Sequence, residues 1–140
     1  MKIGLKAGER LFINGAVIRA ERKTSIELLN DAVFLLEGHV LQAEQATTPL
    51  RQIYFILQTM IMDPNAAASA GDMLDMVLTS SSRTFSHPLV LERLDEVSRL
   101  AGEKRWFEAM KLIRDLYPIE AELISGSYSE RLPELRSAAG

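Results

Sequence analysis

The chain has no cysteine among its 140 residues. That absence excludes disulfide bridges, thiolate metal sites and cysteine nucleophiles, and it fits a reducing compartment. Long apolar runs are also lacking: charged residues stand close to the N-terminus, and no stretch approaches the roughly 20 apolar residues of a membrane span. We therefore expect a cytoplasmic protein with no export signal and no membrane anchor.

Side chains that commonly carry catalysis are scarce. The two histidines, His39 and His87, lie in no recognisable motif, and the glycines near the N-terminus fall among expected strands instead of a strand-to-helix phosphate loop. The spacing of Glu37, His39 and Glu44 matches no standard metal site. The sequence thus predicts no catalytic residue, no metal and no cofactor, and it favours a binding protein over an enzyme.

The composition that is present is typical of a globular domain, with 47% apolar and 25% charged residues. The net charge of −3 conceals an asymmetry along the chain. Residues 1–46 carry six basic and six acidic side chains, whereas residues 47–140 carry ten basic and thirteen acidic ones. A polyanion should therefore prefer the N-terminal half.

Short apolar runs separated by turn residues between Lys2 and Leu41 predict β-strands. The strongest turn signal is Asn14-Gly15, because a two-residue type I′ turn needs two residues that tolerate positive φ. We expect an antiparallel β meander. Its strands after that turn are Ala16–Ala20, Ser25–Leu29, Ala32–Leu36 and His39–Leu41.

The pattern becomes helical after residue 46. Thr47-Thr48-Pro49 supplies an N-cap and a proline at the first helical position, and Asp63-Pro64-Asn65 ends the helix that follows. Further helices are expected at Ala66–Leu78, Pro88–Leu100 and Lys104–Leu116, with a Ser/Thr-rich loop at 79–86 and a last short helix from Pro118 to Ile124. The fold class is therefore α+β, a β meander followed by a helical bundle.

Three regions follow from these patterns. Residues 1–46 form a β-rich subdomain and residues 47–126 a helical one. Residues 127–140 are poor in apolar anchors, so we expect a flexible tail.

Basic residues flank the expected strands of the β-rich subdomain, where a folded sheet can gather them for contact with nucleic-acid phosphates. The candidates are Lys2, Lys6, Arg10, Arg19, Arg22 and Lys23. The alternative is that the interspersed Glu9, Glu21 and Glu27 neutralise them as an ordinary solvated surface.

Methionines gather around the corner between the first two expected helices. Met60, Met62, Met73 and Met76 are candidates for an adaptable groove that binds a protein partner, and the alternative is that they fill the core.

Two stretches resemble a known family. They are Leu5-Lys6-Ala7-Gly8-Glu9-Arg10-Leu11-Phe12-Ile13-Asn14-Gly15 and the run from Leu41 through Thr47-Thr48-Pro49 into Arg51-Gln52-Ile53-Tyr54-Phe55. The order of features resembles the FlbT family of flagellar biosynthesis repressors over essentially the whole chain. The resemblance implies a protein that associates with the 5′ untranslated region of flagellin messenger RNA, lowers its translation or stability, and works with a FlaF-type regulator.

The strand region is also similar to the carbon storage regulator CsrA, on the basis of Gly8-Glu9 followed by Leu11-Phe12-Ile13. This similarity implies RNA contact at Lys6 and a homodimer or higher oligomer through the β half. Leu5 stands where CsrA has a second basic residue, and Leu36–His39 offers no arginine for the last strand.

Two hypotheses of function result. In the first, the β half binds a flagellin mRNA leader through its basic residues and the helical half docks a protein partner. In the second, the chain is a protein-interaction adaptor that acts through a FlaF-type regulator or a flagellin or secretion component, and its effects on RNA are indirect.

Overall fold

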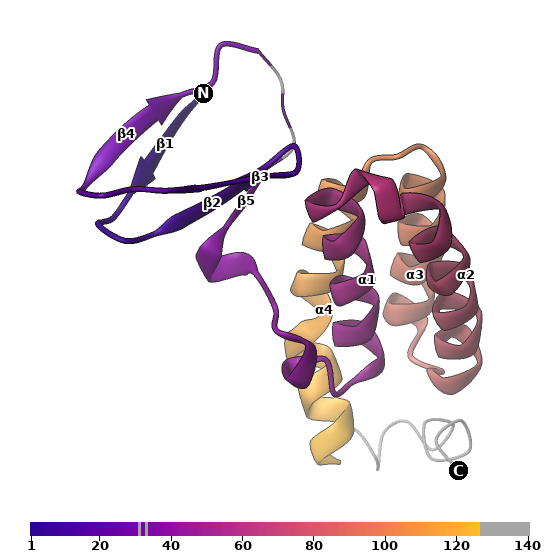
Figure 1. The fold of residues 1–140 in the computed structure, drawn as a ribbon. Coiled ribbons are helices and arrows are strands. Elements are labelled where there is room, and N and C mark those ends of the chain that lie inside the picture. The colour runs from indigo at the N-terminus through magenta and orange to yellow at the C-terminus, as the bar shows by residue number, and fades with distance from the viewer. Residues whose placement is uncertain (31, 33, 127–140) are drawn as a thin grey trace.

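The structure is a computed structural model that describes residues 1–30, 32 and 34–126. Within them, a β half of short antiparallel strands precedes a helical half of four helices, which confirms the α+β class (Figure 1). The strands are β1 (Lys2–Leu5), β2 (Arg10–Ile13), β3 (Ala16–Arg19), β4 (Thr24–Glu27) and β5 (Phe34–Leu36). The helices are α1 (Pro49–Met62), α2 (Ala67–Thr84), α3 (Pro88–Gly102) and α4 (Trp106–Ser125). Short 3₁₀ turns lie at Glu37–His39, Ala43–Gln45 and Pro64–Ala66.

The strands form two small sheets. In one, β1 pairs with β4, and in the other β2 lies between β3 and β5. All pairings are antiparallel as expected, but the connectivity departs from a simple meander, because β2 and β3 are the one consecutive pair that is hydrogen-bonded among the described strands. The two sheets enclose a small apolar core built from Ile3, Leu5, Leu11 and Ala20.

The β2–β3 hairpin confirms the turn read from the sequence. Asn14 and Gly15 have φ of 48° and 83°, the two positive values that a type I′ turn requires. This turn brings Leu11 opposite Ile18 and Arg10 opposite Arg19. The hairpin therefore sets which side chains share an edge of the sheet.

The expected strand His39–Leu41 is wrong. Residues 37–39 form a 3₁₀ turn, and the side-chain amide of Gln58 both accepts from the Leu41 N–H at 2.7 Å and donates to the Leu41 carbonyl at 2.8 Å. The Tyr54 hydroxyl donates to the His39 carbonyl at 2.5 Å. Side chains of α1 thus satisfy backbone groups that a neighbouring strand would otherwise bond.

The expected limits of α1 are confirmed. The Thr48 hydroxyl accepts from the Arg51 N–H at 3.2 Å, Pro49 begins the helix, and the helix ends at Met62, just before Asp63.

The expected loop at 79–86 is wrong, because α2 continues to Thr84. Ser82 and Thr84 donate to the carbonyls four residues earlier, at 2.9 and 3.0 Å, so their hydroxyl groups are satisfied within the helix. The Ser81 side chain is buried. A run of hydroxyl residues is therefore compatible with the helix here.

The expected break before Pro118 is also wrong, because α4 runs through this proline to Ser125. Leu116 and Leu123, on either side of it, are buried, as is Glu120. Packing of this face against α1 outweighs the local preference of proline to end a helix.

The two halves share apolar contacts. Phe12 from β2 and Leu35 from β5 join the buried cluster that α1, α2, α3 and α4 build. The expected subdomain boundary after residue 46 stays a prediction, and the expected flexible tail at 127–140 lies outside the described residues. No helix in the described part of the chain combines the length and apolarity needed to cross a membrane.

Candidate functional site

Five of the six predicted RNA-binding residues lie at one end of the β half. We call this end the distal tip and define it as residues 6–10 and 19–23. The β1–β4 ladder ends with Leu5 opposite Thr24, which places Lys6 next to Lys23. The β2–β3 ladder ends with Arg10 opposite Arg19, three residues before Arg22. All five basic side chains are exposed.

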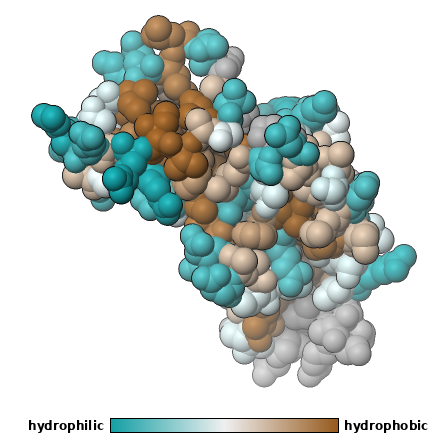
Figure 2. All heavy atoms as spheres, in the orientation of Figure 1, coloured by the Kyte–Doolittle hydropathy of each residue, from teal (hydrophilic) through white to brown (hydrophobic). Residues whose placement is uncertain are grey.

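Backbone hydrogen bonds hold the two segments of the distal tip together. The Gly8 N–H donates to the Ala20 carbonyl at 2.7 Å, and the Ala20 N–H donates to the Glu9 carbonyl at 3.0 Å. Gly8 has φ of 81°, as position three of the turn at residues 6–9 demands. The tip is the end of the β half that points away from the helices (Figure 1), and hydrophilic residues cover it in Figure 2.

Arg10 is partly neutralised. Its Nε donates to Glu37 Oε1 at 2.8 Å, and its backbone N–H donates to Glu37 Oε2 at 3.2 Å. These hydrogen bonds from Arg10 lower the pKa of Glu37 below the usual glutamate range. The carboxylate also offsets the repulsion between Arg10 and Arg19, which face each other across the hairpin.

The remaining cations of the distal tip are available to a ligand. Within residues 1–30, 32 and 34–126, no carboxylate lies within ion-pair distance of Lys6, Arg19, Arg22 or Lys23. Nearby acids reduce the net charge without pairing, and Glu9 accepts from the backbone N–H of Lys6 at 2.9 Å.

Lys2 stands apart from the distal tip. It lies at the other end of β1, in register with Glu27 of β4. Lys2 and Lys6 are four positions apart along the extended chain, a length of about 13 Å. The structure therefore does not bring Lys2 together with the other five candidates.

The four candidate methionines separate into two pairs. Met60 is buried and Met62 packs against the same helical core. Met73 and Met76, one turn apart on α2, are 56% and 73% exposed. A partner could reach the second pair without any rearrangement of the fold.

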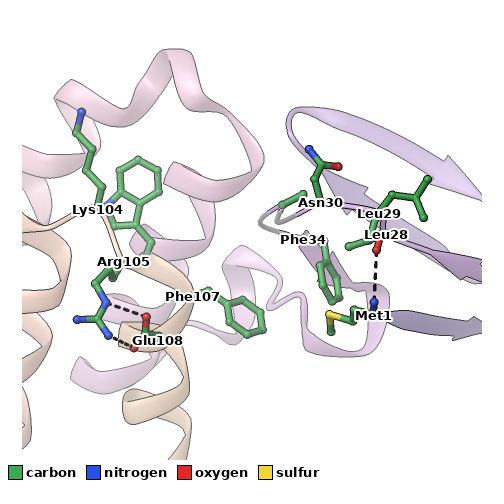
Figure 3. A pocket seen from close by; sticks show the side chains of 11 residues that line it. Met1, Leu28, Leu29, Asn30, Phe34, Lys104, Arg105, Phe107 and Glu108 are labelled. Carbon is green, nitrogen blue, oxygen red and sulfur yellow. Dashed lines mark hydrogen bonds and ion pairs between the residues drawn. The ribbon is translucent and has the colours of Figure 1, made fainter.

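A pocket that the sequence did not reveal lies between the β half and the start of α4 (Figure 3). Its volume is about 590 Å³. Phe34 of β5 and Phe107 of α4 face each other there, with ring centroids 6.1 Å apart. Leu28 and Trp106 also line it. The sequence signal for this pocket was the two adjacent apolar pairs at 28–29 and 106–107. The sequence around each pair does not indicate that the two come together in the fold.

Glu120 was also missed, although it anchors the start of α1 to α4. This fully buried carboxylate accepts from the Thr48 hydroxyl at 2.6 Å and from the Leu50 N–H at 3.0 Å. Arg51 lies 3.6 Å from the carboxylate and stacks over the Tyr117 ring at 4.4 Å. The stretch that carries the family resemblance therefore fixes the entry into α1.

The two histidines lie on different elements: His39 ends the 3₁₀ turn after β5, and His87 immediately precedes α3. Partial burial and the charge of Arg114 lower the pKa of His39, which favours its neutral form. His87 is the N-cap residue of α3. No group of three or more His, Asp or Glu side chains within the described residues is placed to hold a metal ion.

Comparison with known proteins assigns the chain to a family. Residues 1–124 match the family described as "Flagellar protein FlbT". The chain is 52% identical over 124 residues to a protein of Brucella ovis, covering 89% of the chain and 82% of the relative. It is 46% identical over 127 residues to a protein of Mesorhizobium japonicum (91% and 86%) and 45% identical over 139 residues to one of Chelativorans sp. (99% and 96%). Each relative is named a probable flagellum biosynthesis repressor protein FlbT. No solved structure matches.

Proposed function

Because the chain belongs to the FlbT family of flagellar proteins, we propose that it represses flagellum biosynthesis by binding the 5′ untranslated region of flagellin messenger RNA. The distal tip is the observation that supports RNA contact. It exposes four cations that have no ion-pair partner among the described residues, on a part of the molecule that projects away from the helices. Phosphate contacts need positive charge within reach of the strand, and this surface offers it.

The geometry of the tip suits a single strand. Its cations come from two short segments that hydrogen bonds hold side by side, so they offer a narrow charged edge instead of a broad face. Arg19 and Arg22 carry planar guanidinium groups that can also stack on unpaired bases. Among the tip cations, Arg10 should contribute least, because Glu37 already pairs with it.

The test is fluorescence anisotropy of a labelled flagellin-leader RNA at increasing salt. We expect a log–log salt slope of roughly −3, since each of four phosphate contacts on a single strand contributes about −0.7. Replacement of Arg19, Arg22 and Lys23 by glutamate should weaken binding about a hundredfold at low salt, because attraction becomes repulsion.

The control is Lys111→Glu, a charge reversal at an exposed position on α4. It should leave the affinity for RNA within about twofold, because its effect on a distant site is screened. Absence of binding at low salt, or an equal loss in Lys111→Glu, would refute direct RNA contact at the tip.

The second candidate function is a protein-interaction adaptor, and the exposed Met73 and Met76 support it. Methionine side chains adapt to varied partner surfaces, so α2 is the proposed docking face for a FlaF-type regulator. Repression that survives neutralisation of the tip but is lost after Met73→Glu and Met76→Glu would replace the RNA proposal with this one.

A homodimer or higher oligomer through the β half belongs to the same proposal. β3 is an edge strand, and it exposes Val17 and Ile18. Exposed apolar edge strands readily pair with another chain, and a second copy there would place two tips on one assembly.

A further inference from the structure

The pocket between the halves is largely apolar. Phe34 and Phe107 form a contacting aromatic pair in its lining, and Leu28, Ala32 and Trp106 line it as well. Figure 3 shows the Phe107 ring pointing from α4 toward Phe34. A volume of about 590 Å³ accommodates several apolar side chains of a ligand.

Exposed apolar residues surround the same opening. Phe107 is 37% exposed, Leu29 is 88% exposed, and both line the pocket. A hollow bordered by exposed large apolar side chains is typical of the centre of a protein interface, where an inserted side chain gains most from leaving water.

The charge at the rim is positive. Among the described residues that line the pocket, the charged groups are the Met1 ammonium, Lys104, Arg105 and Glu108, so cations outnumber carboxylates. Arg105 is tied to Glu108 by two hydrogen bonds of 2.8 and 2.5 Å, and Glu103, which lies 3.4 Å from Arg105, also pairs with Arg99 at 2.8 Å. Lys104 is exposed and, within the described part of the chain, no carboxylate lies within ion-pair distance of it. The N-terminus of α4 has no side-chain cap, which adds partial positive charge at the same rim.

We propose that this pocket docks an acidic amphipathic segment of a protein partner, whose apolar side chains pack against the Phe34–Phe107 pair while a carboxylate pairs with Lys104. The apolar lining favours a polypeptide with hydrophobic side chains, and Lys104 favours one that is negatively charged. The site is separate from the distal tip and from Met73 and Met76, so it does not depend on RNA binding.

Trp106 makes the proposal directly measurable, because it is the single tryptophan of the chain and lines the pocket. The probe is a synthetic amphipathic helix of about 18 residues, or five turns, with leucine along one face and glutamate elsewhere. A comparison peptide has the same sequence with lysine in place of each glutamate. We expect the acidic peptide to shift Trp106 emission to shorter wavelength and to bind at least about tenfold more tightly than the basic one.

Three variants of the full chain locate the binding. Phe107→Glu and Leu29→Glu should each weaken the acidic peptide about tenfold or more, and Leu29 is so exposed that its replacement leaves folding intact. Lys104→Glu should remove the preference for the acidic peptide. The matched control is Ile124→Glu, a charge placed on a residue of α4 that is 64% exposed and belongs to no proposed site, which should leave peptide binding unchanged.

Several outcomes overturn the proposal. Equal affinity for both peptides, or an equal loss in Ile124→Glu, would show non-specific apolar binding. A change in Trp106 emission on adding leader RNA that Leu29→Glu abolishes would assign the pocket to nucleic acid. Self-association in sedimentation that Leu29→Glu abolishes would assign it to a second copy of this chain.

Discussion

At the scale of single residues, Arg10 stabilises the fold through Glu37, and the same contact weakens it as a phosphate ligand. It sits opposite Arg19, a like charge, and its guanidinium binds Glu37, which lies 27 positions away in the sequence. The pair joins β2 to the turn that follows β5. Its partial neutralisation explains why a basic residue at the tip need not be a strong phosphate ligand.

Arg10→Gln should raise the pKa of Glu37 toward the ordinary glutamate range, because the hydrogen bonds and charge of Arg10 are what lower it. A lowered carboxyl pKa in the folded state contributes stability above the unfolded pKa, and this contribution is lost as pH falls through the folded value. The variant should therefore lose stability mainly near neutral pH. NMR titration of the side-chain carboxyl carbon measures the shift.

Glu108 provides the internal reference for this titration. Its pKa is also lowered, by hydrogen bonds from Arg105, the residue before α4, and Arg10→Gln leaves that pair intact. A Glu37 pKa that stays low in the variant would show that the Arg10 pair is not its cause.

The sequence identifies charges better than it identifies their partners. The prediction grouped six basic residues because they flank the expected strands, namely Lys2, Lys6, Arg10, Arg19, Arg22 and Lys23. The neutralisation of Arg10 and the separation of Lys2 could not be foreseen, since both depend on register between strands that are distant in sequence.

At the scale of elements, α1 determines the path of the connection that precedes it. Gln58 is 3% exposed and makes two hydrogen bonds to the Leu41 backbone. Tyr54 holds His39 one turn earlier on the helix. The connection between the β half and the helical half is therefore bound to α1 along its length.

Gln58→Leu should reduce the free energy of unfolding by about 1–3 kcal/mol, because both backbone groups of Leu41 lose their buried partner. The amide of Leu41 should also exchange with deuterium faster. Urea unfolding and native-state hydrogen exchange measure the two effects. Gln52→Leu, at an exposed position of the same helix, is the control, and unchanged protection at Leu41 would contradict the assigned role.

Local signals predicted some elements well. Asn14-Gly15 defines a hairpin and Thr48-Pro49 starts a helix, because each depends on residues adjacent in the chain. The helical course of α2 through its serines and of α4 through Pro118 depends on tertiary packing, which local preference does not contain.

At the scale of the whole molecule, Glu120 connects distant parts of the chain. It lies near the end of α4 and accepts from Thr48 and Leu50, which lie 72 and 70 positions earlier. A buried carboxylate in this position closes the helical bundle against the start of α1. Its contribution should appear in global unfolding.

Glu120→Leu should destabilise the protein by about 3 kcal/mol. The Thr48 hydroxyl and the Leu50 N–H would lose their acceptor, and the charge of Arg51 would lie beside an apolar side chain without its carboxylate. The midpoint of urea unfolding should fall accordingly. Glu122→Leu, an exposed position on the same helix, should change stability by no more than about 0.5 kcal/mol. Equal midpoints for the two variants would show that the Glu120 contacts contribute little.

The sequence predicted the fold class, but it did not predict which distant segments lie side by side. The change from strand-like to helical patterns near residue 46 indicated α+β, and the family resemblance is confirmed. The pocket combines residues 28–34 with residues 104–108, and no pattern within either segment shows that they meet.

The connection between the halves, which α1 binds at His39 and Leu41, also affects how the molecule moves. Since Tyr54 and Gln58 bind it to α1, and Phe12 and Leu35 enter the helical core, the sheets and the bundle should rotate in solution as one solid. An RNA bound at the distal tip and a polypeptide bound in the pocket would then stay at a fixed distance from each other. Each ligand would then affect binding of the other mainly by direct contact or by steric exclusion.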